Sequence, residues 1–300
     1  MATPEHTIPR PSPNAYGDAP GRSMSNAVAD AVAKVATAIG RPARLGVAFS
    51  GGVDSSVLLA VAVRALGPRR TLAILGVSPS LAADERAAAH AVAAYIGAPI
   101  LEIETHEGDN PAYRANGPDR CFHCKDELFT RISDEVAARY GLTAVAYGEN
   151  ADDAIRADRP GSRAAANHAV LRPLADAGLD KAAIRAVAHA LGLPSADKPA
   201  APCLASRIPH FQEVTPEKLR QVEAAESALR SLGLRECRVR HHGDIARIEL
   251  HVEDLVRAVS TGLREDIHRA VTAAGFRFVA LDVAGIQSGA FTLSLVAVRG

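Results

Sequence analysis

Apolar residues in the first part of the chain form short continuous runs that alternate with longer segments of helical spacing. The continuous runs have the length of strands and cover residues 44–49, 71–77, 99–104 and 142–147. The segments with helical spacing cover residues 25–39, 57–66, 81–96 and about 126–140. Strands that alternate with helices pair in parallel through right-handed crossovers. This pattern predicts an α/β fold with a doubly wound parallel sheet.

The pattern changes near the C-terminus. A helix is expected over residues 216–232, and two alternating segments, 236–242 and 244–251, meet at Gly243 and predict a hairpin. A helix over about 264–274 and strands near 278–283 and 291–298 follow. We therefore expect one domain over residues 25–209 and a smaller α+β domain over residues 210–300. Residues 1–24 contain five prolines and few large apolar side chains, which predicts a disordered tail.

The sequence Ser-Gly-Gly-Val-Asp-Ser-Ser at residues 50–56 lies between the first predicted strand and the following helix. Two adjacent glycines allow a tight turn and a close approach of the backbone to a ligand. The first amides of the helix have no partner within it, and the helix dipole favours an anion there. Ser55 and Ser56 add hydroxyl donors, and a carboxylate such as Asp54 can hold Mg²⁺ beside a polyphosphate. The alternative is a Gly-Ser turn with no ligand.

This loop differs from the common P-loop, because no lysine follows Gly52. It resembles the SGGxDS loop of the PP-loop (N-type) ATP pyrophosphatases. In that superfamily the loop binds the leaving pyrophosphate, while AMP is transferred to an oxygen of the substrate. The resemblance implies ATP and Mg²⁺ as ligands, with Asp54 also catalytic. It assigns nucleotide binding to Ser50, Gly51, Gly52, Val53, Asp54, Ser55 and Ser56.

Composition limits the class of protein. Of the 300 residues, 48% are apolar, and the formal net charge is zero, which argues against a broad nucleic-acid surface. The sequence shows no apolar run long enough for a bilayer and no signal-peptide pattern, so we expect neither a membrane partner nor export. Four cysteines in a chain of this length suit a reducing compartment, and we expect a cytoplasmic protein. Cys237 is expected to be a small buried strand residue.

The other three cysteines have several interpretations. Cys121 and Cys124 form a C-x-x-C pair, and Cys203 follows among prolines that hold the chain in a stiff conformation. They can be unrelated thiols, or the pair can be a redox dithiol, although no thioredoxin-like context surrounds it. They can bind zinc, with His123 or His210 as a fourth ligand, or an iron–sulfur cluster with one open iron. Spacing alone does not separate zinc from iron–sulfur.

Several further strings extend the resemblance over nearly the whole chain after the tail. They are RCFHCK at 120–125, YGENADD at 147–153, KPAAPCLASR at 198–207 and RVRHHGDIARIE at 238–249. Together with the loop, they are similar to the LarE family of ATP-dependent sulfur transferases, which act in nickel-pincer cofactor synthesis. The resemblance implies that ATP adenylates a carboxylate of pyridinium-3,5-biscarboxylic acid mononucleotide. Sulfur then displaces AMP and leaves a thiocarboxylate.

The family has a form with one cysteine and a form with three. In the first form, a cysteine matching Cys203 gives up its own sulfur and becomes dehydroalanine. In the second form, cysteines resembling Cys121, Cys124 and Cys203 bind a [4Fe-4S] cluster whose open iron carries sulfide. This chain has all three, so the resemblance favours the cluster form, with a separate sulfur donor as a possible partner. It also implies a homo-oligomer, with the C-terminal domain serving substrate binding and oligomerisation.

The resemblance also assigns charged residues to the substrate. Arg238 and Arg240 share one face of a strand, opposite Cys237 and Val239, and paired guanidiniums suit a phosphate group. With the resemblance, we expect them to bind the phosphate of the mononucleotide, and the alternative is a pair of solvated charges. Ser206 and Arg207 are candidates for the same phosphate, and Glu149 and Asp152 or Asp153 for Mg²⁺ or the nucleotide, with a plain acidic loop as the alternative. For Glu249 we expect a salt bridge with Arg247, and the alternative is a metal site at a subunit contact.

Three other functions compete with sulfur transfer. An ammonia-dependent PP-loop ligase, such as NAD or GMP synthetase, explains the loop but gives the cysteines no role. A tRNA-thiolating enzyme uses the cysteines, but the zero net charge counts against an RNA partner. A zinc-stabilised, nucleotide-binding regulator is the non-enzymatic alternative.

Overall fold

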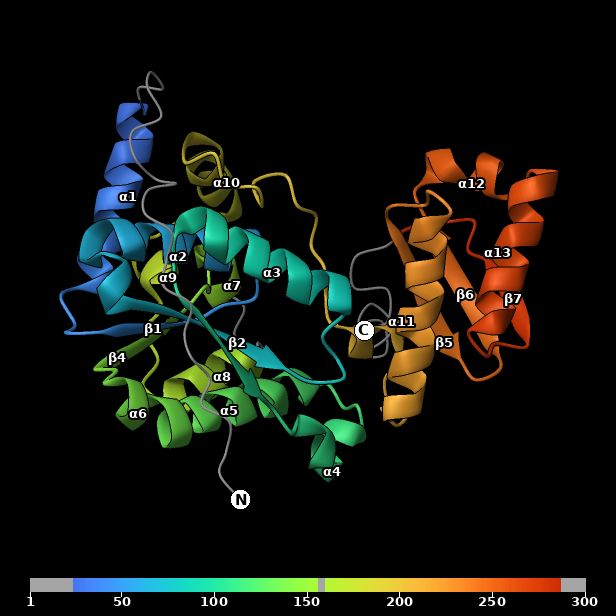
Figure 1. Cartoon of the computed structure of the whole chain (residues 1–300), viewed down its shortest axis with the longest axis horizontal. Helices are drawn as coiled ribbons and strands as arrows, with labels where there is room; N and C mark the ends of the chain where they lie inside the picture. Colours follow the sequence, from blue (N-terminus) through green and yellow to red (C-terminus); the bar gives the residue numbers. More distant parts are fainter. Residues whose placement is uncertain (1–23, 156–159, 287–300) are drawn as a thin grey trace. The chain divides into compact units, whose positions relative to one another are not determined.

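The computed structural model describes residues 24–155 and 160–286, which form two compact units (Figure 1). The first unit contains the chain up to Ser78, Ala83–Glu107 and Cys121–Ala201. The second contains Pro79–Ala82, Gly108–Arg120 and the chain from Pro202 onward. The second unit thus begins before the expected boundary at residue 210 and takes two short segments from the first half of the chain. The predicted tail up to residue 23 and the predicted strand at 291–298 lie outside the described residues.

The first unit contains the predicted parallel sheet. Its strands are β1 (Leu45–Ala48), β2 (Thr71–Val77), β3 (Ile100–Glu104) and β4 (Ala144–Tyr147). They run in the order β3-β2-β1-β4, and every pair is parallel. The chain therefore crosses from one side of β1 to the other between β3 and β4, which confirms the doubly wound fold. Ligands of such sheets bind where the strand order reverses, at the carboxyl ends of the strands.

Helices cover both faces of this sheet (Figure 1). One face is covered by α1 (Asn26–Ile39), α2 (Val53–Leu66), α3 (Ala83–Ile96) and α10 (Lys181–Ala190). The other face is covered by α5 (Arg120–Arg131), its continuation η3 (Ile132–Ala137) and α6 (Ala138–Tyr140), and α8 (Pro160–Asn167). The short elements are η1 (Pro68–Arg70), η2 (Glu107–Asp109), α4 (Pro111–Arg114), α7 (Ala151–Ala154) and α9 (Pro173–Asp176).

Helix α2 is the central helix of the first unit. Its residues 57–62 are at most 1% exposed, because α1, α3 and α10 surround it and the sheet lies beneath it. On the opposite face, Phe129 and Ile132 pack against Leu72 and Ile74 of β2. Each buried side chain of this size contributes about 1.5–3 kcal/mol relative to an exposed one. The predicted nucleotide loop at residues 50–56 therefore joins a buried strand to a buried helix. These two elements hold the ends of the loop in place.

One predicted helix start in the first unit was wrong, and two neighbouring features were not expected. Helix α5 begins at Arg120, so Cys121 and Cys124 lie on its first turn instead of in a loop before a helix at about 126. Residues 160–167 form α8, a helix that was not among those expected. The apolar segment after it contributes a single parallel bridge, from Leu171 to Ala146, before Pro173 starts α9.

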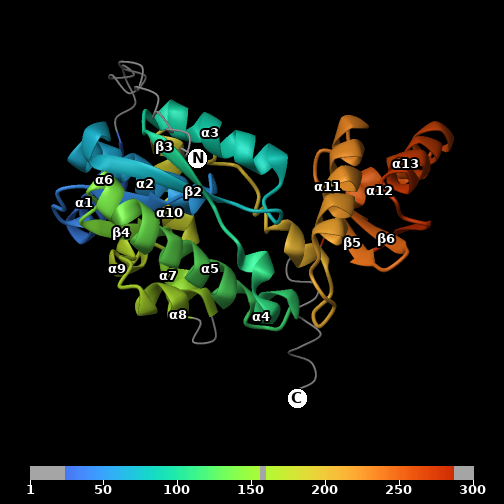
Figure 2. The same ribbon diagram turned by 60° about the horizontal axis from the view of Figure 1, so that its bottom comes forward.

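The second unit is a three-stranded sheet with helices against one face. Its elements are η4 (Leu204–Arg207), α11 (Pro216–Ser231), β5 (Cys237–His242), β6 (Ile245–Leu250), α12 (Val252–Ala258), α13 (Thr261–Ala273) and β7 (Phe278–Leu281). The strand order is β5-β6-β7, with β5 antiparallel and β7 parallel to β6. Helix α11 packs against β5 and α13 (Figure 2). The hairpin at Gly243 is confirmed, whereas α12 was not expected.

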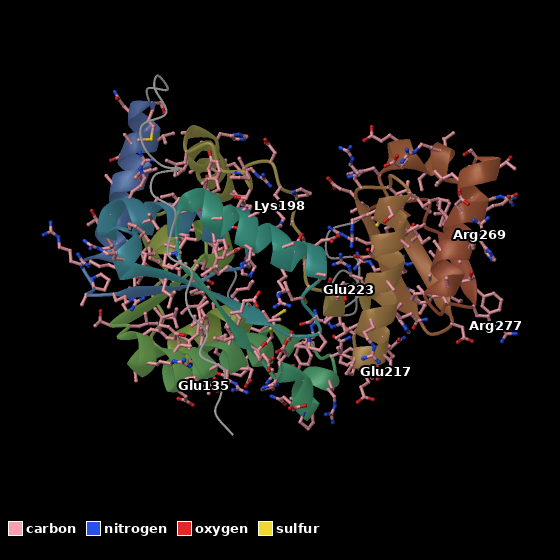
Figure 3. All side chains as sticks on the ribbon, in the orientation of Figure 1. Glu135, Lys198, Glu217, Glu223, Arg269 and Arg277 are labelled. Atoms are coloured by element: carbon pink, nitrogen blue, oxygen red, sulfur yellow. The ribbon has the colours of Figure 1, made fainter. Side chains whose placement is uncertain are left out.

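The outer surfaces carry charged side chains (Figure 3). Glu217 on α11 and Arg269 on α13 are exposed and extend from the second unit (Figure 3). Within residues 24–155 and 160–286, none of the helices combines the length and the hydrophobicity that crossing a bilayer requires.

Candidate functional site

The predicted nucleotide loop lies at the carboxyl end of β1. Gly51 has φ of 70°, and a Cβ atom there would lie 2.8 Å from the Cα of Ala89, so both the conformation and the space require glycine. Gly52 is the N-cap of α2, and no side chain makes a cap hydrogen bond. The first amides of α2 therefore have neither helical acceptors nor a capping side chain, and they are available to an anion.

The serine hydroxyls organise the loop from inside. Ser55 Oγ and Ser56 Oγ donate to the carbonyl of Gly52 over 3.1 and 2.8 Å. Ser50 Oγ lies 3.2 Å from Ser55 Oγ, and the Ser50 amide donates to the same Ser55 oxygen over 3.3 Å. Ser56 is completely buried, so its role in this conformation is to brace the turn, while Ser50 is exposed.

The loop after β4 packs directly on the start of α2. A Cβ atom on Gly148 would lie 2.7 Å from the amide nitrogen of Ser55 and 2.9 Å from its Cα. Only glycine allows this approach, because the clashing atoms belong to backbone. Two strand ends thus meet at the nucleotide loop, since β4 pairs with β1.

Asp54 has two partners that the sequence did not suggest. Lys181 Nζ lies 2.5 Å from Asp54 Oδ2, and Asn150 Nδ2 donates to Asp54 Oδ1 over 3.2 Å. Lys181 is the first residue of α10 and Asn150 the N-cap of α7. The site therefore contains a lysine after all, supplied from a distant part of the chain. The Asp54 side chain is 22% exposed, so it fits as a ligand for Mg²⁺ that arrives with ATP.

The acidic residues that follow β4 lie in different environments. Asp152 is exposed, and its Oδ2 accepts a 2.9 Å hydrogen bond from the backbone amide of Lys181. Asp180 caps the same helix start by accepting from the amide of Ala183. Asp152 therefore places the start of α10 beside the nucleotide loop, while its exposure leaves it accessible to a cation.

Glu149 is almost completely buried and has partners on both carboxylate oxygens. Ser162 donates to Oε1, and Arg172 Nη1 lies 3.3 Å from Oε2. Burial alone would raise the pKa of Glu149, but the Ser162 hydrogen bond and the positive charges of Lys125 and Arg172 lower it below its ordinary value. This geometry favours a role in positioning the strand end over direct binding of Mg²⁺.

The cysteines predicted to bind metal are divided between the two units. Cys121 and Cys124 lie one turn apart on α5 and therefore share a helix face, with Cys121 exposed and Cys124 half-buried. Cys203 is exposed and belongs to the second unit, where it precedes η4. In the part of the chain that the structure describes, no three His, Cys, Asp or Glu side chains form a metal-binding group. The three-cysteine site stays a prediction.

The segment after Cys203 is held by Arg207. Its guanidinium forms a two-bond pair with Glu226 (2.8 and 3.2 Å) and donates to the carbonyl of Pro202 over 2.7 Å and to Ser206 Oγ over 3.0 Å. Arg207 and Glu226 are buried, so this ion pair is part of the interior of the second unit. Arg207 thus has a structural role that does not depend on a phosphate.

Arg240 has a similar arrangement. Its guanidinium pairs with both oxygens of Glu249, over 2.9 and 2.8 Å, and donates to the carbonyl of Ser206 over 3.0 Å. Glu249 also lies 3.3 Å from Arg247, which confirms the expected salt bridge but shows that Arg240 is its nearer partner. Sequence reasoning missed Glu226 and the Arg240–Glu249 pair, because both depend on contacts between residues of different elements.

Arg238 lies on the same face of β5 and is half-buried. Burial lowers the pKa of Arg238, and the positive charges of Arg240 and Arg207 lower it further. The carboxylates of Glu249 and Glu226 act in the opposite direction and raise it. Arg207 and Arg240 are buried whereas Arg238 is partly exposed, so Arg238 is the most accessible to a phosphate of the three predicted arginines.

Comparisons with known proteins agree with this geometry. A family model described as asparagine synthase matches residues 26–137. An uncharacterized protein of Synechocystis sp. is 41% identical over 243 residues, which cover 81% of this chain and 90% of that protein. The pyridinium-3,5-bisthiocarboxylic acid mononucleotide synthase of Lactiplantibacillus plantarum is 34% identical over 249 residues, covering 82% of this chain and 88% of that enzyme. An uncharacterized protein of Methanocaldococcus jannaschii is 28% identical over 239 residues.

The fold, the uncapped start of α2 and these matches identify an ATP-using enzyme. The matched part includes most of this chain and most of each relative. The chain belongs to the LarE family of the PP-loop superfamily.

Proposed function

We propose that this protein is an ATP-dependent sulfur transferase that converts a carboxylate of pyridinium-3,5-biscarboxylic acid mononucleotide to a thiocarboxylate for nickel-pincer cofactor synthesis. The observation that carries the proposal is the presence in one chain of an uncapped helix start at the SGGVDSS loop and an accessible thiol at Cys203. The first suits cleavage of ATP, and the second suits delivery of sulfur. The name of the Lactiplantibacillus plantarum relative supports the choice of substrate.

The first step is adenylation. A carboxylate oxygen of the substrate attacks the α-phosphorus of ATP, and the bond to the bridging oxygen breaks, so pyrophosphate leaves with the electron pair. The amides at the start of α2 and the ammonium of Lys181 are the groups that would stabilise the charge on the leaving pyrophosphate. Mg²⁺ bound with ATP supplies further charge stabilisation, and Asp54 is the residue that would hold it.

The second step is transfer of sulfur. A sulfur nucleophile attacks the acyl carbon of the adenylate, and AMP leaves with the electron pair of its bond to that carbon. In the single-use form, Cys203 is the nucleophile, and loss of a proton from its α-carbon then breaks the Cβ–S bond and leaves dehydroalanine. In the form we favour, Cys121, Cys124 and Cys203 would hold a [4Fe-4S] cluster, and the bound cluster would present an extra sulfide, delivered by a separate sulfur donor, as the nucleophile.

Replacement of Cys203 tests the division of labour. Cys203→Ala is expected to abolish thiocarboxylate formation, measured by product mass, while substrate-dependent pyrophosphate release persists. Loss of pyrophosphate release in a folded variant would contradict this division.

Iron and sulfide analysis of protein purified without oxygen separates the two sulfur sources, because about four irons per chain support the cluster. One zinc and no iron would exclude it. An amide product formed with ammonia would favour the ligase alternative.

A further inference from the structure

The segment Gly108–Arg120 belongs to the second unit, although both flanking parts of the sequence belong to the first. Within the second unit it lies against the chain that follows Cys203. Val214 donates its amide to the carbonyl of Arg114 over 2.9 Å, and Arg120 Nη1 donates to the carbonyl of Ala205 over 3.0 Å. The segment therefore braces the Cys203 loop, which we define as residues 203–212.

Asn116 is the centre of this brace and is completely buried. Its side-chain Nδ2 donates to three backbone carbonyls of the Cys203 loop, and its backbone carbonyl accepts from the loop as well. The three acceptors are Ile208 (3.2 Å), Pro209 (2.8 Å) and Gln212 (3.1 Å), and the contacts to the Asn116 carbonyl come from the Phe211 amide (3.1 Å) and His210 Nδ1 (3.1 Å). The Asn116 side chain thus holds three residues of the second half of the loop, and its backbone carbonyl contacts the other two.

Arg120 extends the brace toward Cys203. Its Nη1 donates both to Asn116 Oδ1 and to the carbonyl of Ala205, and its side chain is buried. Both acceptors are neutral oxygens. Burial of a charge costs free energy that neutral acceptors offset only partly, so a simple stabilising role explains Arg120 poorly. Arg120 is also bonded directly to Cys121, so the same residue holds the backbone beside two of the predicted sulfur-site cysteines.

The contact between the two segments joins two residues with positive φ, and one of them is strained. Asn116 has φ of 56° and Phe211 has φ of 65°, and the two residues share the hydrogen bond from the Phe211 amide. The left-handed region is tolerated by asparagine but costs a phenylalanine about 1–3 kcal/mol. The Phe211 side chain is 69% exposed, so packing of its ring does not offset that cost. The hydrogen bonds from Asn116 hold the loop in this shape.

We propose that Asn116 and Arg120 are positioning residues that fix the Cys203 loop for sulfur transfer, an inference that rests on the proposed function. The loop backbone next to Cys203 is already tied, because the Cys203 carbonyl accepts from the Ser206 amide and the Leu204 amide donates to the Ser80 carbonyl, both over 2.9 Å. Asn116 and Arg120 extend this order from residue 205 to residue 212. A sulfur atom misplaced by about 1 Å costs a reaction about 100-fold in rate.

The test compares the same substitution at two asparagines of one segment. Asn116→Gly keeps the positive φ accessible and removes the side chain. Asn110→Gly is the matched control, since Asn110 is exposed and only caps α4 by accepting from the Ala112 amide over 2.9 Å. A single-turnover assay is expected to show thiocarboxylate formation about 100-fold slower for Asn116→Gly. Pyrophosphate release should stay within about twofold of wild type for both variants.

Arg120→Gln is the second variant, because it removes the hydrogen bond to the Ala205 carbonyl without a backbone change. We again expect slower thiocarboxylate formation with pyrophosphate release close to wild type. Hydrogen exchange gives a readout independent of activity. Amides of residues 204–212 should exchange faster than in wild type in Asn116→Gly and Arg120→Gln, and at the wild-type rate in Asn110→Gly. Wild-type sulfur transfer in both loop variants would overturn the inference, as would equal losses in both steps. If wild type itself forms no thiocarboxylate, the proposed function fails, and unchanged exchange of residues 204–212 in both variants separately refutes the bracing.

Discussion

The ammonium of Lys181 lies 2.5 Å from the carboxylate of Asp54, although the two residues are 127 positions apart in the sequence. Asp54 lies in the first turn of α2, where the helix dipole and unpaired amides favour an anion. The ion pair with Lys181 holds the Asp54 carboxylate in addition to this effect. The pair therefore links the start of α10 to the predicted nucleotide loop.

Removal of the Lys181 charge is expected to slow the first step. Lys181→Met should reduce substrate-dependent pyrophosphate release about 100-fold, because one cationic donor to the leaving group is lost. A continuous pyrophosphate assay measures the rate. Lys34→Met is the control, since Lys34 forms an exposed ion pair with Asp30 at 2.8 Å on α1. Equal rates for the two variants would remove Lys181 from the site.

The two arginines of β5 are expected to respond differently to the same change. Arg240→Ala leaves the completely buried Glu249 without its nearest cation, so the free energy of unfolding should fall by about 3–5 kcal/mol. Arg238→Ala should leave stability nearly unchanged and raise KM for the mononucleotide without a matching loss of kcat, because a phosphate contact is lost. Urea unfolding and steady-state kinetics check both expectations. A KM effect from Arg240→Ala alone, at full stability, would reverse the assignment.

Alternation along the strand predicted the face that these arginines share but not their partners. A guanidinium that suits a phosphate suits a carboxylate equally. The register between β5 and β6 places Glu249 opposite Arg238 and diagonal to Arg240, and it is Arg240 that forms the ion pair with it. The same limit applies to Lys181, because nothing in its local sequence relates it to Asp54. Contacts made across long stretches of chain carry no periodic signal.

The parts that the sequence predicted well are those set by local physical chemistry. Apolar runs predicted the parallel sheet, and the two glycines predicted the turn that Gly51 makes with its positive φ. The start of α5 was missed, since the residues Cys-Phe-His at 121–123 are weak helix formers and the buried contacts of Arg120 are made by residues far along the chain. The assignment of residues 108–120 to the second unit follows from the same distant contacts.

The thiols should differ sharply in reactivity. Burial raises the pKa of Cys237 to about 12, which leaves roughly one thiolate in 100,000 at pH 7. Cys121 and Cys203 are exposed. Alkylation of the metal-free native protein, followed by mass spectrometry of its peptides, should modify Cys121 and Cys203 quickly and Cys237 only after unfolding. Rapid labelling of native Cys237 would contradict its placement in the interior.

Acid should weaken one ion-pair cluster of the first unit. Glu102 on β3 accepts from Arg86 over 2.7 Å and lies 2.7 Å from His90. The hydrogen bond from Arg86 lowers the pKa of Glu102 from 4.5 to about 2, against the opposing effect of burial. A lowered pKa stabilises the folded state above the unfolded pKa, and this stability is lost as pH falls from about 4.5 toward 2.

Glu102→Gln should therefore cost about 1 kcal/mol at pH 7, a modest value because Arg86 is half exposed. The difference in the free energy of unfolding between the variant and wild type should shrink as the pH falls below the ordinary pKa of glutamate. Urea unfolding of both proteins at pH 7 and at about pH 3 measures it. A difference that stays constant between the two conditions would show that the charge of Glu102 contributes nothing.

The cleavage of ATP between its α- and β-phosphates is the central claim, and product analysis tests it most directly. Protein purified without oxygen is given ATP, Mg²⁺, a sulfur source and the biscarboxylate mononucleotide, and the nucleotides are separated by chromatography. We predict AMP and pyrophosphate in equal amounts, formed only when the carboxylate is present, together with a thiocarboxylate product. Formation of ADP and inorganic phosphate instead would contradict the account.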